Sequence, residues 1–326
     1  MRALFLSFFL QRDDEKAVIL QQEIYLLMNG KMLRQRIKPW MLPIAMLAGV
    51  LLHDYIDSVA FFTPWLIFVM LLVTFCRIDP RHIGFSRMIW MLLGVQIAGA
   101  VLVYLAVRPL GLTLAQGLFI CVFCPTATAA PVVTGMLGGN VGKLVAYSLV
   151  SNVVVAVSAP FLLAWLSVEA VDPVAATAGI MGHVAPLILG PLAVALTLRV
   201  LSPKVCHAIA EHQSLSFYLW AVALLIVVGR SVSFIMAEPA SRIVDILWLS
   251  AGAGGVCVAQ FWIGRRIGYR YGDRISGAQG LGQKNTVLAI WLALTYLDPL
   301  SSVAPAAYIA WQNTINSAQL YRKARG

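Results

Sequence analysis

Charged residues are scarce in this chain. Only 12% of its 326 residues are Asp, Glu, Lys or Arg, and 60% are hydrophobic, whereas soluble proteins have about 25% charged residues. No carboxylate lies well inside a long apolar run, and the one that comes closest to doing so, Asp245, lies at the edge of such a run. The mean hydropathy is +0.83. This composition excludes an ordinary soluble domain and predicts an all-α polytopic membrane protein.

The sequence also lacks the patterns of several redox and enzyme classes. Its five cysteines lie in or beside apolar runs, so no disulfide framework is indicated, and the CxxC spacing of Cys121 and Cys124 has no βαβ pattern around it. No Ser/His/Asp pattern or His/Cys metal spacing is visible. The glycines after Gly277 follow no strand and precede no Gly-Lys-Ser/Thr, which excludes a phosphate loop. We expect no enzymatic activity, no metal and no cofactor.

The apolar runs are spaced as membrane spans of about 20 residues each. We predict ten spans, at 39–52, 58–76, 86–107, 112–137, 141–166, 175–199, 214–236, 243–263, 276–297 and 300–321. An acidic link outside the membrane separates a first five-helix repeat, 39–166, from a second, 175–321. Halves with an odd number of spans insert in opposite orientations, so the count predicts two inverted five-helix repeats.

The basic residues predict the orientation, because short cytoplasmic loops carry an excess of Lys and Arg. With the N-terminus inside, 20 of the 24 basic residues face the cytoplasm, and only Arg108 and Arg242 lie outside. We therefore expect both termini in the cytoplasm and the protein in the cell inner (plasma) membrane. The net charge of +10 then reflects topology, and no nucleic-acid partner is predicted.

Residues 1–38 are predicted to be a cytoplasmic N-terminal segment that lies in part at the membrane interface. The apolar run at its start is short and no small-residue cleavage site follows, which is not the pattern of a signal peptide. A true start at Met28 or Met32 is an alternative interpretation of the same stretch.

Two spans are interrupted by residues that weaken helices. The fourth contains Cys124-Pro-Thr-Ala-Thr-Ala-Ala-Pro131, and the ninth contains three glycines followed by Lys284. Non-helical backbone at membrane depth is tolerated only where protein or a water-filled cavity covers it. Interrupted spans at corresponding places in two halves are typical of secondary transporters, whose binding site lies where they meet. We predict that the broken fourth and ninth helices cross at the membrane centre.

Lys284 is the most informative residue of the second interruption, because a lysine inside a span is costly. With no carboxylate nearby in the sequence, its ammonium could bind the carbonyl end of the broken fourth span, where the helix dipole is negative. It could equally pair with an anionic substrate or give up its proton. A purely structural lysine that ties the two broken helices together is the competing interpretation, and the two roles are compatible.

Other polar side chains should converge if the interruptions cross. Some are expected to bind a small polar or anionic ligand and others only to satisfy the interrupted backbone. They are Thr126, Thr128, Thr134, Gln279, Gln283, Asn285 and Thr286. Polar residues in other spans are expected mainly to join packed helices by hydrogen bonds. These are Ser148, Ser151 and Asn152, Gln312, Asn313 and Asn316, and the pair Gln96 and Gln260.

From about Lys38 to Tyr321 the chain resembles the bile acid/sodium symporter family. The resemblance rests on Cys-Pro-x-x-Thr-Ala at 124–129, Gly-Asn-Val at 139–141, and Gly-x-x-Asn-x-x-Leu-Ala at 282–289. It implies a panel domain, 39–76 and 175–236, that moves against a core domain, 86–166 and 243–321. It also implies a substrate site at the crossover that includes Ala130 and Pro131.

The same resemblance implies positions for two sodium ions, and there the sequence departs from the family. Sodium-binding members use four sets of ligands: a Ser-Asn pair, a Ser with a Thr, a Glu, and a Gln. The matching positions here are Ala130 and Pro131, Leu144 and Ser148, Gly280 and Lys284. Hard cations need oxygen ligands, so we do not expect sodium to bind as in the family. Any relocated ligands would be sought among Gln96, Gln260, Gln279 and Gln283.

Together these observations predict a secondary transporter of a small organic anion that works by alternating access without sodium, with Lys284 in place of the cation. A sodium-coupled bile acid-type symporter is the first alternative. An arsenite-type exporter using Cys124 is the second, and a sensor or membrane enzyme is a further one from a different class. The predicted partners are the anion and the lipid bilayer, and monomer and dimer both stay open.

Overall fold

The computed structural model describes residues 41–78, 86–127, 129–166, 172–211 and 213–325. The predicted N-terminal segment, 1–38, lies outside the described residues. In the described part the regular structure is helical throughout, apart from one isolated β-bridge. The α-helices are α2 (Met41–Leu51), α3 (Thr63–Arg77), α4 (Arg87–Val107), α5 (Leu112–Phe123), α6 (Ala130–Leu137), α7 (Val141–Leu166), α8 (Pro173–Leu201), α9 (Pro203–Glu211), α10 (Gln213–Ala237), α11 (Ile243–Arg270), α12 (Arg274–Gly282), α13 (Thr286–Tyr296) and α14 (Val303–Arg325).

Short 3-10 helices extend or join several of these. They are η2 (His53–Ser58), η3 (Ala60–Phe62), η5 (Arg108–Leu110), η6 (Ala240–Arg242) and η7 (Pro299–Ser302).

Six helical stretches within the described residues are long and apolar enough to cross a membrane on their own. They are 60–77, 87–110, 141–166, 174–201, 218–237 and 240–270. The described part of the chain is thus helical and has the apolar helices of a multi-pass membrane protein, but six is fewer than the ten spans predicted.

The difference lies in four predicted spans, and each has a physical cause. The fourth and ninth are divided into shorter helices, α5 with α6 and α12 with α13. The first is represented by α2, which has only 11 residues. The tenth is represented by α14, which is long enough at 23 residues but carries several amides and a basic tail in its second half. None of these four predicted spans therefore corresponds to a single helix that is both long enough and apolar enough to cross a membrane on its own.

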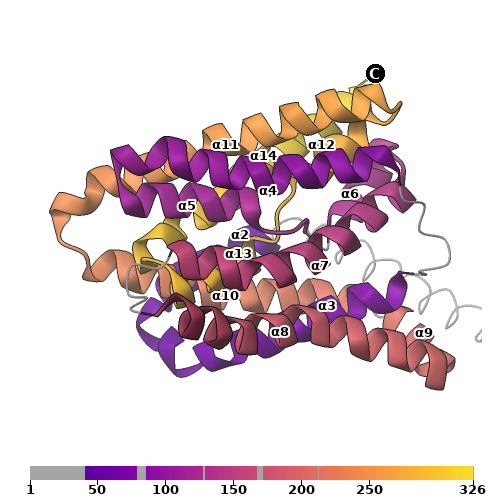
Figure 1. Cartoon of the computed structure of the whole chain (residues 1–326), viewed down its shortest axis with the longest axis horizontal. Helices are drawn as coiled ribbons and strands as arrows, with labels where there is room; N and C mark the ends of the chain where they lie inside the picture. The colour runs from indigo at the N-terminus through magenta and orange to yellow at the C-terminus, as the bar shows by residue number, and fades with distance from the viewer. Residues whose placement is uncertain (1–40, 79–85, 128, 167–171, 212, 326) are drawn as a thin grey trace, which may run out of the picture.

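The helices form two packed groups with two helices between them (Figure 1). In one group α10 packs against α2 and α3, and α3 packs against α8. In the other, α11 packs against α5, α12 and α14, and α4 packs against α5. Between the groups, α7 contacts α8, α4 and α12, while α13 contacts α10, α5 and α14. The interrupted helices therefore belong to the second group or to the layer between the two.

Within the second group, α11 and α12 approach each other very closely. A Cβ placed on Gly264 would collide with the carbonyl oxygen of Gly277, and a Cβ on Gly277 would collide with that of Gly264. Such contact between backbones is possible only without side chains, as in other membrane helix pairs that meet through small residues. The glycines thus fix α12, and with it the second interruption, against α11.

Local sequence explains where the interrupted helices stop. Cys124 has ψ 147°, outside the helical region, because the following Pro125 disfavours helical backbone at the residue before it. α12 ends at Gly282, and Gln283 is extended with ψ 108°. Three glycines weaken this helix over its last turns. Both interruptions therefore occur at the residues where the sequence predicts them.

Candidate functional site

The two interruptions lie side by side and run antiparallel. Thr126 and Lys284 form an isolated antiparallel β-bridge. The backbone N–H of Ala127 donates to the carbonyl of Gln283 at 3.0 Å, and that of Asn285 donates to the carbonyl of Pro125 at 2.8 Å. Each interruption thus satisfies part of the other's exposed backbone, as a non-helical segment inside a membrane protein must. We call the described residues of the two segments together, 124–127, 129 and 283–285, the crossover.

The carbonyl end of α5 points at the crossover and is satisfied by side chains from other segments. The last carbonyls of a helix have no partner within the helix, and here four consecutive ones accept hydrogen bonds from long side chains. The donors are Gln260 Nε2 to Cys121 (3.2 Å), Lys284 Nζ to Val122 (2.8 Å), and Gln96 Nε2 to Phe123 (2.7 Å) and Cys124 (3.1 Å).

Lys284 is the only charged residue among these donors, and it is only 1% exposed. Within the described residues, no carboxylate forms an ion pair with it. Its ammonium instead lies at the negative end of the α5 dipole, on the Val122 carbonyl. A buried cation needs such compensation, because the desolvation of an ammonium is costly. The structure thus places Lys284 where the sequence suggested a cation could bind carbonyls.

The second interruption is stabilised by several shorter contacts. The Thr126 hydroxyl donates to the Gly280 carbonyl at 2.8 Å, and the Tyr308 hydroxyl donates to that of Gly282 at 2.8 Å. At its other side, the Asn285 side chain accepts from the N–H of Leu288 at 3.2 Å and so caps the N-terminus of α13. Gln312 on α14 accepts from the Lys284 N–H at 3.0 Å. The positive end of α13 therefore begins directly after the crossover.

Two of the predicted cation-site positions have no free oxygen ligand in this conformation. A Cβ on Gly280 would lie 3.0 Å from the Tyr147 ring, so the ring occupies the space next to this glycine. The Gln96 side-chain oxygen already accepts hydrogen bonds from Tyr147 (2.6 Å) and Ser151 (2.9 Å), while its nitrogen makes the two bonds described above. Since an amide oxygen has two lone pairs, Gln96 is fully occupied.

The remaining predicted site residues fall into two sets. Ala130 and Pro131 have no polar side-chain atom and form the first turn of α6, while Ser148 is buried on α7. Four other residues are buried and carry a side-chain oxygen without a hydrogen-bond partner in the described structure. These are Thr134, Gln279, Gln283 and Thr286. Thr128 lies outside the described residues.

Sequence reasoning missed two residues that help build the site, Tyr147 and Tyr308. Both are among the largest fully buried side chains. Each is hydrogen-bonded to one of the two glutamines that cap α5, Tyr147 to Gln96 at 2.6 Å and Tyr308 to Gln260 at 3.0 Å. A signal was present: each tyrosine precedes a polar residue by one helical turn, Ser151 or Gln312, and so shares its face.

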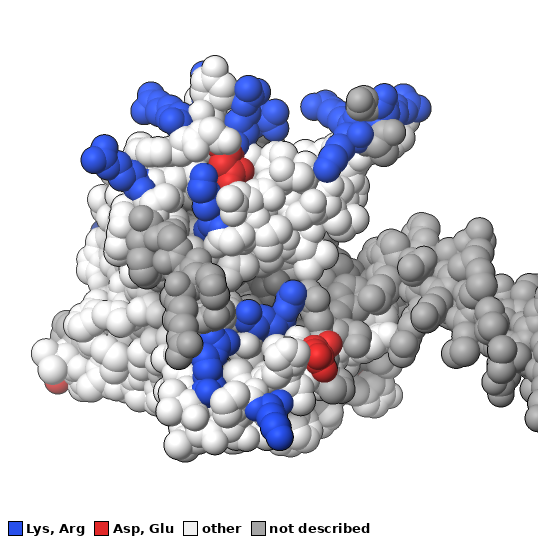
Figure 2. Space-filling model, turned by 90° about the vertical axis from the view of Figure 1, so that its right-hand side faces the viewer, with Lys and Arg blue, Asp and Glu red and all other residues white. Residues whose placement is uncertain are grey.

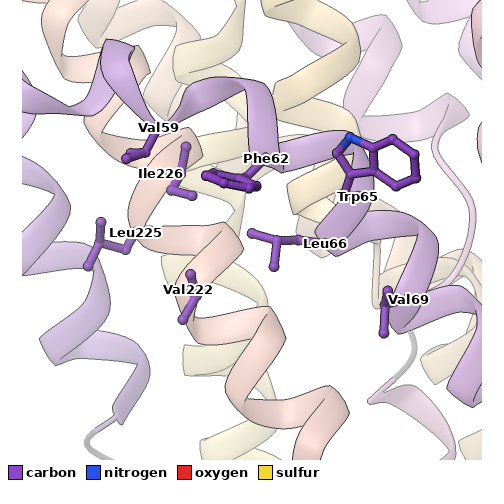
Figure 3. Close-up of a pocket in the computed structure, with 8 residues that line it drawn as sticks. All are labelled: Val59, Phe62, Trp65, Leu66, Val69, Val222, Leu225 and Ile226. Atoms are coloured by element: carbon purple, nitrogen blue, oxygen red, sulfur yellow. The ribbon is translucent and has the colours of Figure 1, made fainter.

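A different hollow opens between α3 and α10 (Figure 3), with a volume of about 380 Å³. Its lining is entirely apolar and consists of Val59, Phe62, Trp65, Leu66, Val69, Val222, Leu225 and Ile226. A charged ligand placed there would lose its hydration without gaining a polar partner. This hollow is therefore not a candidate for an anion site.

No family model and no curated protein matches the chain. The observations that indicate a functional site are therefore geometric: two paired helix interruptions, a buried ammonium at the carbonyl end of α5, and buried polar groups around them.

Proposed function

We propose that the protein is a secondary transporter that carries a small organic anion by alternating access, with the Lys284 ammonium in place of a bound cation. The observation that carries this proposal is the position of Lys284. Its side chain is buried at the crossover and bound to the Val122 carbonyl, without a carboxylate partner in the described part of the chain. Intramembrane ionisable residues mark substrate or ion pathways by default.

The chemistry around the crossover favours an ammonium over a sodium ion. Under the resemblance to bile acid/sodium symporters, a sodium-binding member would have a glutamate at Gly280, where the Tyr147 ring lies. The positions of other ligands are taken by Ala130, Pro131 and Leu144, which have no side-chain oxygen. A hard cation held by oxygen ligands would be poorly coordinated here. An ammonium fixed to the chain compensates the carbonyl dipoles without coordination by those side chains.

Anion transport is supported by the sign of the charges that face the crossover. α6 and α13 both begin there, and helix N-termini attract anions. Lys284 adds a full positive charge between them. Lys284 is buried in this conformation, so an anion could reach it only after a movement. Relative movement of the two helix groups, α2, α3, α8 and α10 against the remaining long helices, would provide this access.

The same proposal includes ten membrane crossings in two inverted repeats, divided into panel and core. It is supported by the repeated pairing of a glutamine with a tyrosine, Gln96 with Tyr147 and Gln260 with Tyr308. The first pair comes from the third and fifth predicted spans of one half, and the second pair from the equivalent spans of the other. Tyr147 is the donor in the first pair and Tyr308 the acceptor in the second, but the same two residue types joining equivalent spans is what two related halves would produce.

The proposed orientation places both termini in the cytoplasm, with the protein in the cell inner membrane. Figure 2 views the end of the molecule that includes the end of α14, and basic side chains outnumber acidic ones across that face. An excess of Lys and Arg is typical of the cytoplasmic side.

The experiment is ligand-induced thermal stabilisation of the purified protein across a panel of small carboxylates and sulfonates, in sodium and in choline. A ligand at about 100 times its Kd stabilises the folded state by about 2.7 kcal/mol. We expect an anion to raise the Tm of the wild type equally in both salts, and Lys284→Gln to lose the response. Lys323→Gln is the matched control, because Lys323 also donates to a carbonyl near the end of a short helix, Met136 on α6, at 2.9 Å, but is exposed.

A sodium-coupled symporter is the second candidate, and one observation favours it. Gln279, Gln283 and Thr286 each carry a buried oxygen without a hydrogen-bond partner in the described structure, and such oxygens suit a cation. If sodium alone raises the Tm of the wild type and the anion response requires it, this candidate replaces the first. The arsenite-type alternative gains no support, since Cys124 is fully buried and no three metal-binding side chains come together in the described residues.

A further inference from the structure

α11 presents one face to the outside of the molecule along most of its length. Its exposed apolar side chains are each more than half accessible and recur at helical spacing: Ile243, Val244, Leu247, Trp248, Val258 and Trp262. From Ile243 to Trp262 the helix rises about 29 Å at 1.5 Å per residue. This length equals the hydrocarbon thickness of a bilayer, about 30 Å. The stripe therefore faces lipid tails, and its two ends mark the two membrane interfaces.

At the end marked by Trp262 the same face changes abruptly to arginine. Arg265, Arg266, Tyr269 and Arg274 are all exposed, and the first three continue the helical spacing from Trp262. Arg266 stacks over the Trp262 ring at 5.2 Å, and Arg274 stacks over the Tyr269 ring at 4.6 Å. Exposed Trp and Tyr rings are enriched at the level of lipid headgroups. The stacked guanidinium groups are thus held at the depth of the lipid phosphates.

The charge of these arginines is not neutralised by carboxylates of the described chain. None of Arg265, Arg266 and Arg274 takes part in an ion pair there. The adjacent acid, Asp273, is turned inward: it is 8% exposed, and one oxygen accepts from the Ser276 N–H at 3.0 Å, capping α12. The opposite end of the helix differs, because Arg242 is paired there with Asp245 at 2.8 Å and with Glu238 at 3.4 Å. Of the two ends of α11, the Trp262 end is thus the one that leaves cations beside lipid without a carboxylate among the described residues.

We propose that Trp262, Arg265, Arg266, Tyr269 and Arg274 form a binding site for the headgroup of an anionic phospholipid. Guanidinium groups bind phosphate oxygens in a bidentate manner, and the aromatic rings beneath them restrict their rotamers. The acyl chains of the same lipid lie along Val258 and the apolar stripe above it. A soluble phosphate compound would gain the charge contacts but not this apolar surface, so the occupant is a lipid of the surrounding bilayer.

The test is titration of the purified full-length protein in mixed micelles with phosphatidylglycerol or phosphatidylcholine, with the Tm as readout. We expect phosphatidylglycerol to stabilise the wild type at lower concentrations than phosphatidylcholine. In Arg266→Gln/Arg274→Gln the apparent Kd for phosphatidylglycerol should rise about 30-fold, since each basic residue near an anionic membrane contributes about a fivefold factor. The matched control is Arg108→Gln, which removes another exposed arginine stacked on a tyrosine, Tyr104, at 6.0 Å, outside this cluster; its Kd should not change.

A second double variant separates charge from folding. Arg266→Lys/Arg274→Lys keeps both charges but loses the bidentate contacts and the ring stacking, so its apparent Kd for phosphatidylglycerol should lie between those of the wild type and the Gln double variant. Equal stabilisation of the wild type by both lipids, or an equal loss in the Lys and Gln double variants, would contradict the proposal. Displacement of phosphatidylglycerol by glycerol phosphate at similar concentrations would also contradict it, because the ligand would then be a soluble phosphate.

Discussion

α5 ends at Phe123 and α6 begins at Ala130, whereas α12 ends at Gly282 and α13 begins at Thr286, so the first interruption is the longer of the two. At the first, three carbonyls of α5 and that of Cys124 are satisfied by Gln96, Gln260 and Lys284, which come from three other segments. The second is stabilised by Thr126 across the crossover, by Tyr308 and Gln312 on α14, and by its own cap, Asn285. Both interruptions thus depend on other helices, the first on α4 and α11 and the second on α14, and the second also has a cap of its own in Asn285.

The contributions across the crossover are also unequal. The backbone contributes one hydrogen bond in each direction, but the side chains differ: the second interruption supplies the charged Lys284 to the end of α5, while the first returns the neutral hydroxyl of Thr126. A charge-assisted hydrogen bond is stronger than a neutral one and responds to any ligand that alters the local charge. An anion that bound Lys284 would therefore weaken the hydrogen bond from Lys284 to α5, and ligand binding would affect the first interruption more than the second.

The largest expected effect concerns the attachment of the second interruption to α11. Gly264→Ala would drive a Cβ into the Gly277 carbonyl, and backbone can yield only by moving α12. We expect a loss of stability of about 3 kcal/mol, read as a lower Tm of the purified protein. Gly255→Ala on the same helix, where a Cβ meets nothing within 4 Å, is the control. An equal Tm for the two variants would show that the glycine contact does not fix α12.

The next effect compares the two tyrosines. Tyr308→Phe leaves the Gly282 carbonyl and the Gln260 amide each without one partner, and a lost buried hydrogen bond costs about 1–3 kcal/mol. Tyr147→Phe removes one of two donors to the Gln96 oxygen, which keeps Ser151. Tyr308→Phe should therefore lower the Tm about twice as much, because it removes two hydrogen bonds instead of one. The reverse order would mean that the first interruption, not the second, depends more on its tyrosine.

The sequence predicted the interruptions and the burial of Lys284, because proline, glycine and a lone lysine in apolar runs are local signals. It did not predict which carbonyls Lys284, Gln96 and Gln260 would satisfy, since that depends on how α4, α5 and α11 pack. Tyr147 and Tyr308 were missed because a tyrosine in an apolar run gives no sign in the sequence that distinguishes it from an ordinary core residue. The family resemblance and the ten spans remain predictions, since hydropathy alone cannot identify a span that is short, broken or rich in amides.

A smaller effect tests the caps of the two half-helices that start at the crossover. Asn285→Ala removes the side chain that accepts from Leu288, and loss of such a cap costs about 1 kcal/mol. In α6 the equivalent residue, Ala129, makes no capping bond and has helical backbone angles, φ −82° and ψ −15°. Ala129→Asn should therefore gain nothing, because a cap requires an extended backbone. A clear rise in Tm for Ala129→Asn would show that α6 begins differently.

The smallest expected effect is that of sodium, for which we predict none. If the Lys284 ammonium occupies the place of a cation at the carbonyl end of α5, exchanging choline for sodium at constant ionic strength should leave the Tm unchanged. Lys284→Gln removes the charge and leaves the Val122 carbonyl to be satisfied in another way. In this variant sodium should stabilise the protein, because a cation can then approach the Val122 carbonyl that the ammonium has left at the negative end of α5. Stabilisation of the wild type to the same extent would mean that the cation binds elsewhere, and that Lys284 only joins the two interruptions.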